Sequence, residues 1–226
     1  MRTRIKFCGL TDRSDVELAC NLGVDYIGFV FYPNSPRFVT ADQAASLRRV
    51  LPSWVQSVGL FVNAESALIE QTSKTVGLDV IQFHGDESPR SCADFFSQHK
   101  AQLHTRAFWQ VARIGEQHDL LAWNSETCLS EALLLDSYSA EYGGTGHAFD
   151  WGLVAVGSPY RPSAAKLIAS GGLTPSNVGE AIALIQPFAV DVSSGVQRAG
   201  DKRRKSEQLM TEFVDHVLSA DAQRKV

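Results

Sequence analysis

Short apolar segments alternate with amphipathic segments from one end of the chain to the other. The apolar segments are rich in Val, Ile, Leu and Phe and run almost without interruption, which is typical of parallel strands buried on both faces. They predict strands over residues 4–8, 25–31, 56–62, 78–83, 102–108, 132–136, 166–170 and 189–193. The segments between and after them predict helices over residues 12–22, 41–51, 64–76, 88–98, 113–122, 148–156, 175–185 and 203–218.

Three of the predicted helices carry start signals. Thr40 and Gln43 have the spacing of a capping box, in which each side chain bonds to the other residue's backbone. Ser88-Pro89 and Thr174-Pro175 each place proline at the first helical position, where its missing N–H is not needed. These signals support the alternating pattern independently of hydrophobicity.

Eight strand–helix units in 226 residues amount to about 28 residues each, which predicts a compact α/β fold of the closed (βα)8, or TIM, barrel type. An open, doubly wound sheet is the competing architecture. Closure is favoured because reactive residues follow both the first and the last strand, which would not generally share a site in an open sheet. No linker divides the chain, so a single domain over residues 1–226 is expected, with polar residues 219–226 as a frayed tail. Residues 109–131 lack a clean periodicity, which leaves the fifth and sixth units least clear.

Charge and cysteine content narrow the function classes. The chain has 21 Lys+Arg and 25 Asp+Glu, a formal net charge of −4. Nucleic-acid binding is not expected, and we interpret the one basic run, residues 201–205, as the solvated first turn of the last helix. Four widely spaced cysteines without a metal-ligand pattern are typical of a reduced cytoplasmic protein. No signal-peptide pattern or apolar run of ~20 residues is present, so no membrane partner is expected.

Two turns of small residues follow the last two predicted strands. Gly171 and Gly172 come after the seventh strand, and Ser194 and Gly195 come after the eighth. In (βα)8 barrels these two loops commonly bind phosphate, because glycine lets backbone N–H groups face the ligand. Either turn alone is most often only a turn, but together they predict a phosphate site. Gly144, in a glycine-rich segment after the sixth strand, is either a ligand contact in a mobile flap or part of a flexible connector.

A thiol and a carboxylate end two other strands. Cys8 closes the first strand; a buried core thiol is the usual outcome for cysteine, but the carboxyl end of a parallel strand is where side chains meet substrate. At an ordinary pKa near 8.5 about 3% of such a thiol is thiolate at pH 7, and a neighbouring cation would increase that fraction. Asp136 ends an otherwise apolar strand and is either a proton donor or a cap for the following loop. Together they predict an acid/base pair suited to isomerisation, which needs no metal and no cofactor.

Two further residues are candidate substrate contacts. Arg37 follows Ser35-Pro36 and is either a bidentate clamp for a carboxylate or phosphate or a surface arginine after a turn. His84, at the end of the fourth strand, is either a hydrogen-bond partner of the substrate or a structural histidine. The residues alone leave both alternatives open.

The strand-end motifs, taken as a set, resemble those of the phosphoribosylanthranilate isomerase family of tryptophan biosynthesis. They run in order along the chain and occur at every predicted strand end except the fifth. The matching segments are residues 6–11, 28–31 with 35–37, 58–63, 82–87, 135–137, 143–146 with 149–151, 170–173 and 191–196.

The resemblance implies an Amadori rearrangement of a small phosphorylated substrate, N-(5-phosphoribosyl)anthranilate, to 1-(2-carboxyphenylamino)-1-deoxyribulose 5-phosphate. By analogy, Asp136 protonates the furanose ring oxygen and opens the ring to a Schiff base. Cys8 then removes the C2 proton to give an enolamine, which tautomerises to the ketone. Arg37 would hold the anthranilate carboxylate, and backbone groups of Gly172 and Ser194 would bind the phosphate.

The chain departs from the family pattern at the entry to the last helix. Gln197 stands where the family usually has glutamate, and residues 200–202 read Gly-Asp-Lys where the family usually has Gly-x-Lys-Asp. Both changes are expected to affect the phosphate rim rather than the reaction. Loss of a carboxylate near a phosphate is expected to reduce electrostatic repulsion.

Two other functions fit the residues. One is a different cofactor-free sugar-phosphate isomerase or epimerase, in which Arg37 has no aromatic carboxylate to hold. The other is a non-catalytic phosphate-ligand binder, which has no need for both Cys8 and Asp136. The fold alone does not decide between them, and the sequence does not distinguish a monomer from a homodimer.

Overall fold

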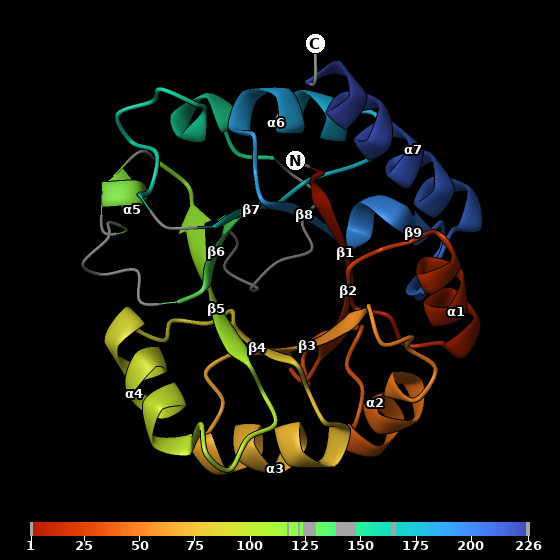
Figure 1. The fold of residues 1–226 in the computed structure, drawn as a ribbon, viewed down its shortest axis with the longest axis vertical. Coiled ribbons are helices and arrows are strands. Elements are labelled where there is room, and N and C mark those ends of the chain that lie inside the picture. Colours follow the sequence, from red (N-terminus) through yellow and green to blue (C-terminus); the bar gives the residue numbers. More distant parts are fainter. Residues whose placement is uncertain are drawn as a thin grey trace.

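Eight parallel strands close into a barrel in the order β1 to β8, and helices surround it (Figure 1). The computed structural model describes residues 2–116, 118–121, 123, 130–138, 148–163 and 166–224. Pairing of β1 with β8 closes the sheet, so the predicted (βα)8 barrel is confirmed and the open sheet is excluded. The strands are β1 (Arg4–Cys8), β2 (Tyr26–Val30), β3 (Gln56–Phe61), β4 (Val80–Phe83), β5 (Ala107–Ile114), β6 (Ala132–Ser137), β7 (Leu167–Ala169) and β8 (Ala189–Val192).

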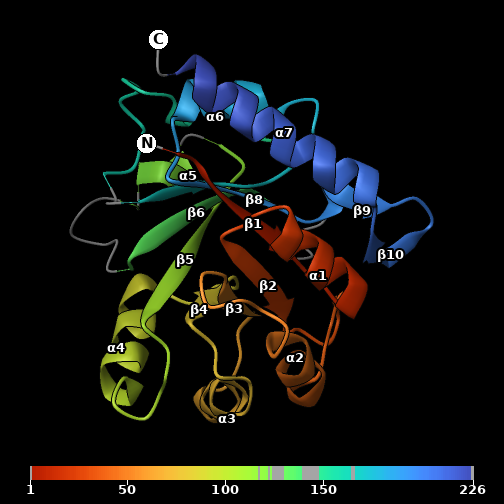
Figure 2. The same ribbon diagram turned by 45° about the vertical axis from the view of Figure 1, so that its right-hand side comes forward.

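Helical segments lie between the strands and cover the outside of the barrel (Figure 2). They are α1 (Arg13–Asn21), α2 (Ala41–Arg48), α3 (Ser66–Val76), α4 (Pro89–His99), α5 (His118–Leu121), the 3-10 helix η1 (Trp151–Val154), α6 (Val178–Ile185) and α7 (Glu207–Gln223). The capping box of Thr40 and Gln43 and the proline at the start of α4 are present as predicted. The start predicted at Thr174-Pro175 is wrong, because α6 begins at Val178 rather than at Pro175. Among the described residues, no helix is long and apolar enough to cross a membrane.

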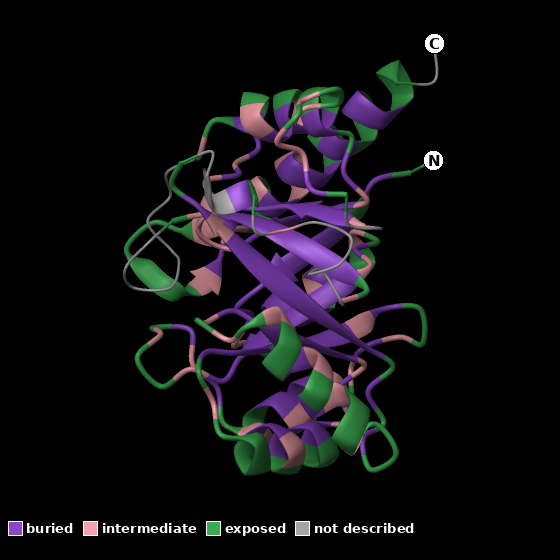
Figure 3. Ribbon diagram, turned by 90° about the vertical axis from the view of Figure 1, so that its left-hand side faces the viewer, coloured by how far each residue is buried: buried purple, intermediate pink, exposed green. Residues whose placement is uncertain are grey.

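Strand pleating divides the side chains of the barrel into two sets. Outward-facing residues pack against the helices; Phe7, for example, meets Phe213 of α7 edge to face, with ring centroids 5.9 Å apart. Inward-facing residues include an apolar cluster with Tyr26, Trp109 and Leu134. Figure 3 shows the strands almost entirely buried and the outer faces of the helices exposed. This apolar filling leaves the carboxyl-terminal rim of the barrel for polar chemistry.

The fifth and sixth units differ from their predictions. β5 spans Ala107–Ile114 rather than residues 102–108, and strand and the short α5 occupy the region in which a helix was predicted over 113–122. The strand was missed because it carries Gln110, which is buried, and Arg113 among its apolar residues. A buried polar residue interrupts the apolar run by which a barrel strand is recognised. In the sixth unit, the helix predicted over 148–156 is the single 3-10 turn η1.

An antiparallel hairpin of β9 (Gln197–Arg198) and β10 (Asp201–Lys205) precedes the last helix. This corrects the interpretation of the basic run as the solvated first turn of that helix. Arg203 Nη1 donates to two carbonyl oxygens of the loop after β2, both at 3.1 Å, and Lys205 is buried. The helix cannot include this run because its N-cap is Ser206, whose side chain bonds to the first turn.

Residues 219–223 belong to α7, which corrects the prediction of a frayed tail. Ala220 and Asp221 are buried. Asp221 accepts hydrogen bonds from the Thr3 N–H at 2.6 Å and from the Thr3 hydroxyl at 2.7 Å. The polar composition that predicted fraying therefore includes a carboxylate that ties the last helix to the segment before β1.

Candidate active site

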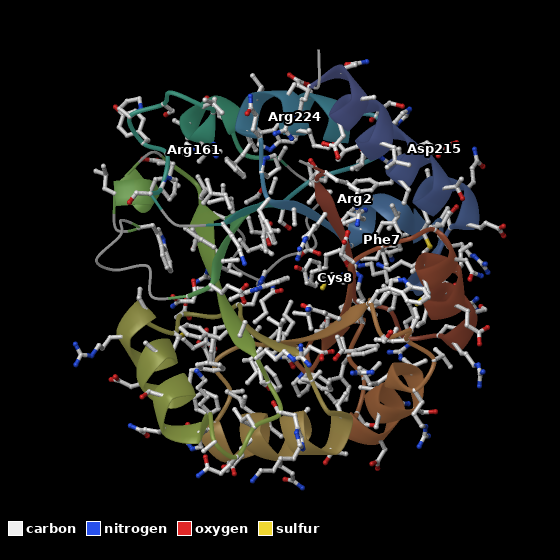
Figure 4. All side chains as sticks on the ribbon, in the orientation of Figure 1. Arg2, Phe7, Cys8, Arg161, Asp215 and Arg224 are labelled. Atoms are coloured by element: carbon white, nitrogen blue, oxygen red, sulfur yellow. The ribbon has the colours of Figure 1, made fainter. Side chains whose placement is uncertain are left out.

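Inward-facing side chains at the carboxyl ends of the strands form a polar cluster. Cys8 ends β1, His84 follows β4 and Asp136 lies near the end of β6, and all three are buried. Figure 4 shows Cys8 toward the middle of the barrel, whereas Phe7 lies on the side of α7. The structure therefore brings the predicted acid and base to one rim, on strands separated by β7 and β8.

Cys8 is enclosed by glycine and by cations. Its Sγ lies 2.8 Å from the point that a Cβ on Gly28 would occupy, so glycine in β2 makes room for the thiol. Its carbonyl oxygen accepts a hydrogen bond from the Ser193 hydroxyl at 3.0 Å. Burial raises the pKa of the thiol, and the ammonium groups of Lys6 and Lys205 only partly offset this effect. The cations that would favour a thiolate are present, but burial dominates.

Lys205 ties the ends of two neighbouring strands together. Its Nζ donates to the carbonyl oxygens of Cys8, at the end of β1, and of Ser193, after β8, both at 2.8 Å. Burial, with a further contribution from the charge of Arg37, lowers the pKa of Lys205 to about 7. Because Lys205 comes from β10, the hairpin forms part of the wall around Cys8.

Asp136 is held from several sides. His84 Nε2 lies 3.3 Å from Oδ2, and the Ser137 N–H donates to Oδ1 at 2.8 Å. A Cβ on Gly171 would lie 2.8 Å from Oδ1, so glycine lets the loop after β7 approach the carboxylate. Gln82 Nε2 lies 3.0 Å from His84 Nδ1; when it donates there, the imidazole proton is on Nε2, the nitrogen that lies near Asp136. His84 is thus a partner of Asp136, a contact that the sequence did not indicate.

Arg37 is a buried residue of the rim rather than a surface arginine. Its Nη2 donates to Oε1 of Gln197 at 2.6 Å, and its buried Nε has no hydrogen-bond partner within the described residues. Gly9, with a φ of +71°, makes room for the side chain, because a Cβ there would lie 2.5 Å from Arg37 Cδ. Burial lowers the pKa of the guanidinium, which still remains charged. The structure therefore presents a cation with an unpartnered donor at the rim.

The two small-residue turns after β7 and β8 lie against each other. Gly171 and Gly172 adopt φ values of +74° and +66°, which favour glycine. A Cβ on Gly195 would lie 1.8 Å from the carbonyl oxygen of Leu173, so this position in the second turn accepts only glycine. Ser194 begins the 3-10 helix η2 (Ser194–Val196) in that turn. The two predicted phosphate loops are thus in close contact through Gly195 and Leu173.

A buried ion pair near Cys8 was not assigned from the sequence. Lys6 of β1 and Asp191 of β8 are neighbours in register, with Nζ 2.8 Å from Oδ2 and side chains that are 0% and 6% exposed. The available signal was one charged residue inside each of two apolar strands, where charges occur only when paired.

Gly144 lies outside the described residues. Within the described part of the chain, no group of three His, Cys, Asp or Glu residues is placed to hold a metal ion.

Comparison with known proteins shows to which family the chain is related. The family model described as N-(5'phosphoribosyl)anthranilate (PRA) isomerase matches residues 5–216. The chain belongs to the PRA isomerase family. The PRA isomerase of Thiobacillus denitrificans is 43% identical over 97% of this chain and 100% of that protein. The PRA isomerase of Nitrosococcus oceani is 45% identical over 98% of this chain and 100% of that protein.

Solved PRA isomerase structures share the barrel. The crystal structure of the Thermotoga maritima enzyme superposes with a TM-score of 0.82 at 34% identity, covering 96% of this chain and 99% of that one. A PRA isomerase in complex with reduced 1-(o-carboxyphenylamino)-1-deoxyribulose 5-phosphate has a TM-score of 0.79 at 32% identity, with the same coverage. The resemblance inferred from the strand-end motifs is therefore confirmed for the fold and for the family.

Proposed function

We propose that the chain converts N-(5-phosphoribosyl)anthranilate to 1-(2-carboxyphenylamino)-1-deoxyribulose 5-phosphate, with Asp136 as general acid and Cys8 as general base. This is the aldose-to-ketose isomerisation of tryptophan biosynthesis, the activity for which the family is named. The observation that supports the residue assignment is the common position of the two groups, since both are inward-facing at the carboxyl-terminal rim of one barrel.

The first step needs a proton on the furanose ring oxygen. Asp136 donates it, the bond between C1 and the ring oxygen breaks, and the lone pair of the anilino nitrogen forms the C=N bond of a Schiff base. The carboxylate left behind keeps its hydrogen bond from the Ser137 N–H, and His84 Nε2 lies 3.3 Å from its other oxygen. Charge-assisted hydrogen bonds of this kind stabilise an anion formed during the reaction.

The second step needs a base at C2. Cys8, as thiolate, takes the C2 proton, the electron pair forms the C1=C2 bond, and the C=N pair returns to nitrogen to give an enolamine. The ketone then forms as the C2 hydroxyl loses its proton and C1 gains one. Because burial raises the pKa of the Cys8 thiol, the thiolate fraction grows as pH rises, so kcat/KM is expected to increase with pH through the neutral range.

The remaining predicted residues, apart from His84, which lies beside Asp136, bind the two ends of the substrate. Arg37 holds the anthranilate carboxylate through guanidinium donors that Gln197 leaves available. The turns of Gly171-Gly172 and Ser194-Gly195 bind the phosphate through backbone N–H groups. Gly144 is retained as a proposed ligand contact from the sequence pattern alone. We further propose action in the cytoplasm, because Cys8, Cys20 and Cys92 are free thiols.

Turnover of two substrates tests this proposal. Loss of anthranilate-amide fluorescence is expected when the protein is added to freshly prepared N-(5-phosphoribosyl)anthranilate. The aniline analogue, which lacks the carboxylate, should show kcat/KM at least about tenfold lower, because a hydrogen-bonded charge on Arg37 loses its partner. Equal turnover of both compounds would identify a sugar-phosphate isomerase without carboxylate recognition. No turnover of either would contradict the proposed reaction.

Substitution Gln197→Glu is expected to raise KM by about tenfold while leaving kcat nearly unchanged. A glutamate at this position would pair with Arg37 and compete with the substrate carboxylate for the guanidinium, whereas the present amide is neutral. We therefore propose that residue 197 acts on the carboxylate end of the substrate rather than through repulsion of the phosphate. Steady-state kinetics measure KM and kcat of the variant. Gln71→Glu, on the exposed face of α3, is the matched control. An unchanged or lower KM for Gln197→Glu would count against this role.

A further inference from the structure

The buried ion pair near Cys8 has a place in this reaction. Lys6 and Asp191 are both inward-facing, and neither is used by the steps above. We propose that Lys6, held by Asp191, is the positioning residue that stabilises the thiolate of Cys8. The inference rests on the proposed role of Cys8 as the base.

Strand geometry places Lys6 directly beside the thiol. Side chains two residues apart on a strand point to the same face, so Lys6 and Cys8 both enter the barrel from β1, one layer apart. Both lie against Gly28 of β2: the point that a Cβ there would occupy is 2.8 Å from Cys8 Sγ and 3.2 Å from Lys6 Cε. The absence of a side chain on Gly28 thus lets the end of the lysine and the thiol share one space.

Asp191 keeps Lys6 charged inside the barrel. A buried ammonium needs a close anionic partner, and Asp191 Oδ2 lies 2.8 Å from Lys6 Nζ. Burial by itself would lower the pKa of Lys6, but the interactions with Asp191 and Cys8 outweigh it and the pKa is raised. Lys6 is therefore an ammonium throughout the neutral range, and it gains a second anion when Cys8 loses its proton.

Within the described residues, three other charged groups act on the thiol. Asp191 of β8 opposes thiolate formation, whereas Lys205 of β10 favours it, and Arg37 in the loop after β2 also interacts with Cys8. Lys205 already donates to two backbone carbonyl oxygens and loses its charge as pH rises through its pKa of about 7. Arg37 is committed to the substrate carboxylate under the proposed function. Among the described cations that interact with Cys8, Lys6 is thus the one that stays charged and is not assigned to the substrate.

Substitution Lys6→Met tests this inference through the reactivity of Cys8. Alkylation by iodoacetamide is followed as a function of pH by mass spectrometry of the peptide that carries Cys8, since only the thiolate reacts. The pH at which alkylation of Cys8 reaches half its maximal rate, the midpoint, is expected to rise by about one pH unit. The value of kcat at pH 7 is expected to fall about tenfold and to recover as pH rises. The matched control is Asp221→Asn, which removes a buried carboxylate bonded to Thr3, about 16 Å along the strand from Cys8. It should lower stability without moving the midpoint.

A second variant covers the case in which Lys6→Met, with Asp191 left unpaired, does not fold. The double substitution Lys6→Met/Asp191→Asn removes both charges and keeps similar volumes. Its midpoint should still lie above that of the unmodified protein, by less than in the single variant because the opposing charge of Asp191 is also gone. A midpoint equal to that of the unmodified protein overturns the inference. A raised midpoint with unchanged kcat at pH 7 supports the Lys6–Cys8 coupling and instead overturns Cys8 as the base.

Discussion

Replacing Asp136 by asparagine is expected to lower kcat by at least about 10²-fold with little change in KM. The amide has nearly the same size as the carboxyl group but no acidic proton, so the ring oxygen must leave unprotonated. KM is expected to stay close to its original value because Arg37 and the backbone turns after β7 and β8 supply the binding contacts. Steady-state fluorescence kinetics with N-(5-phosphoribosyl)anthranilate measure both constants.

The surroundings of Asp136 can accept this change without loss of fold. The oxygen of the new asparagine amide can still accept a hydrogen bond from the Ser137 N–H. The NH2 of the asparagine can donate to His84 Nε2 if the imidazole proton moves from Nε2 to Nδ1. The Gln82 amide then turns over so that its oxygen accepts from Nδ1. Nitrogen NMR of His84 should report this change of tautomer. The matched control is Glu131→Gln, which removes an exposed carboxylate just before the other end of β6 and should keep the original kcat. A kcat within tenfold of the original for Asp136→Asn contradicts its role as the acid.

The fold was predictable because the barrel depends on a pattern that repeats locally. Nearly continuous apolar runs mark strands buried on both faces, and the capping box of Thr40 marks the start of α2. The candidate acid and base were predictable for a related reason. In a parallel barrel all strand ends meet at one rim, so the position of Cys8 and Asp136 within their own strands was enough to bring them together.

Contacts between distant segments were not predictable in this way. Arg37 bonds to a residue 160 positions away, Gln197, and Lys205 reaches the carbonyl of Cys8, 197 positions away. No local periodicity encodes such pairs. The same reason explains why residues 201–205 were wrongly predicted to be solvated. Charge suggests exposure to solvent, but Lys205 is buried and donates to carbonyl oxygens that the sequence does not show to be near it.

Replacing Cys8 by serine is also expected to lower kcat by at least about 10²-fold. A serine hydroxyl fits the space beside Gly28 but is far less acidic than a thiol, so at neutral pH no anion is available to take the C2 proton. The increase of kcat/KM with pH that the raised pKa of Cys8 predicts should disappear in this variant. Cys20→Ser on α1 is the matched control and should retain both the rate and the pH profile.

The two substitutions should stop the reaction at different points, which separates the roles more sharply than rates alone. Without Cys8, Asp136 can still open the ring, so a Schiff base should accumulate and be trapped as a secondary amine by borohydride. Without the Asp136 carboxyl group, the ring stays closed and little Schiff base is available to reduce. Mass spectrometry of the reduced mixtures distinguishes these results. Equal trapping in both variants would mean that ring opening does not depend on Asp136, and another proton donor would then have to be sought at the rim.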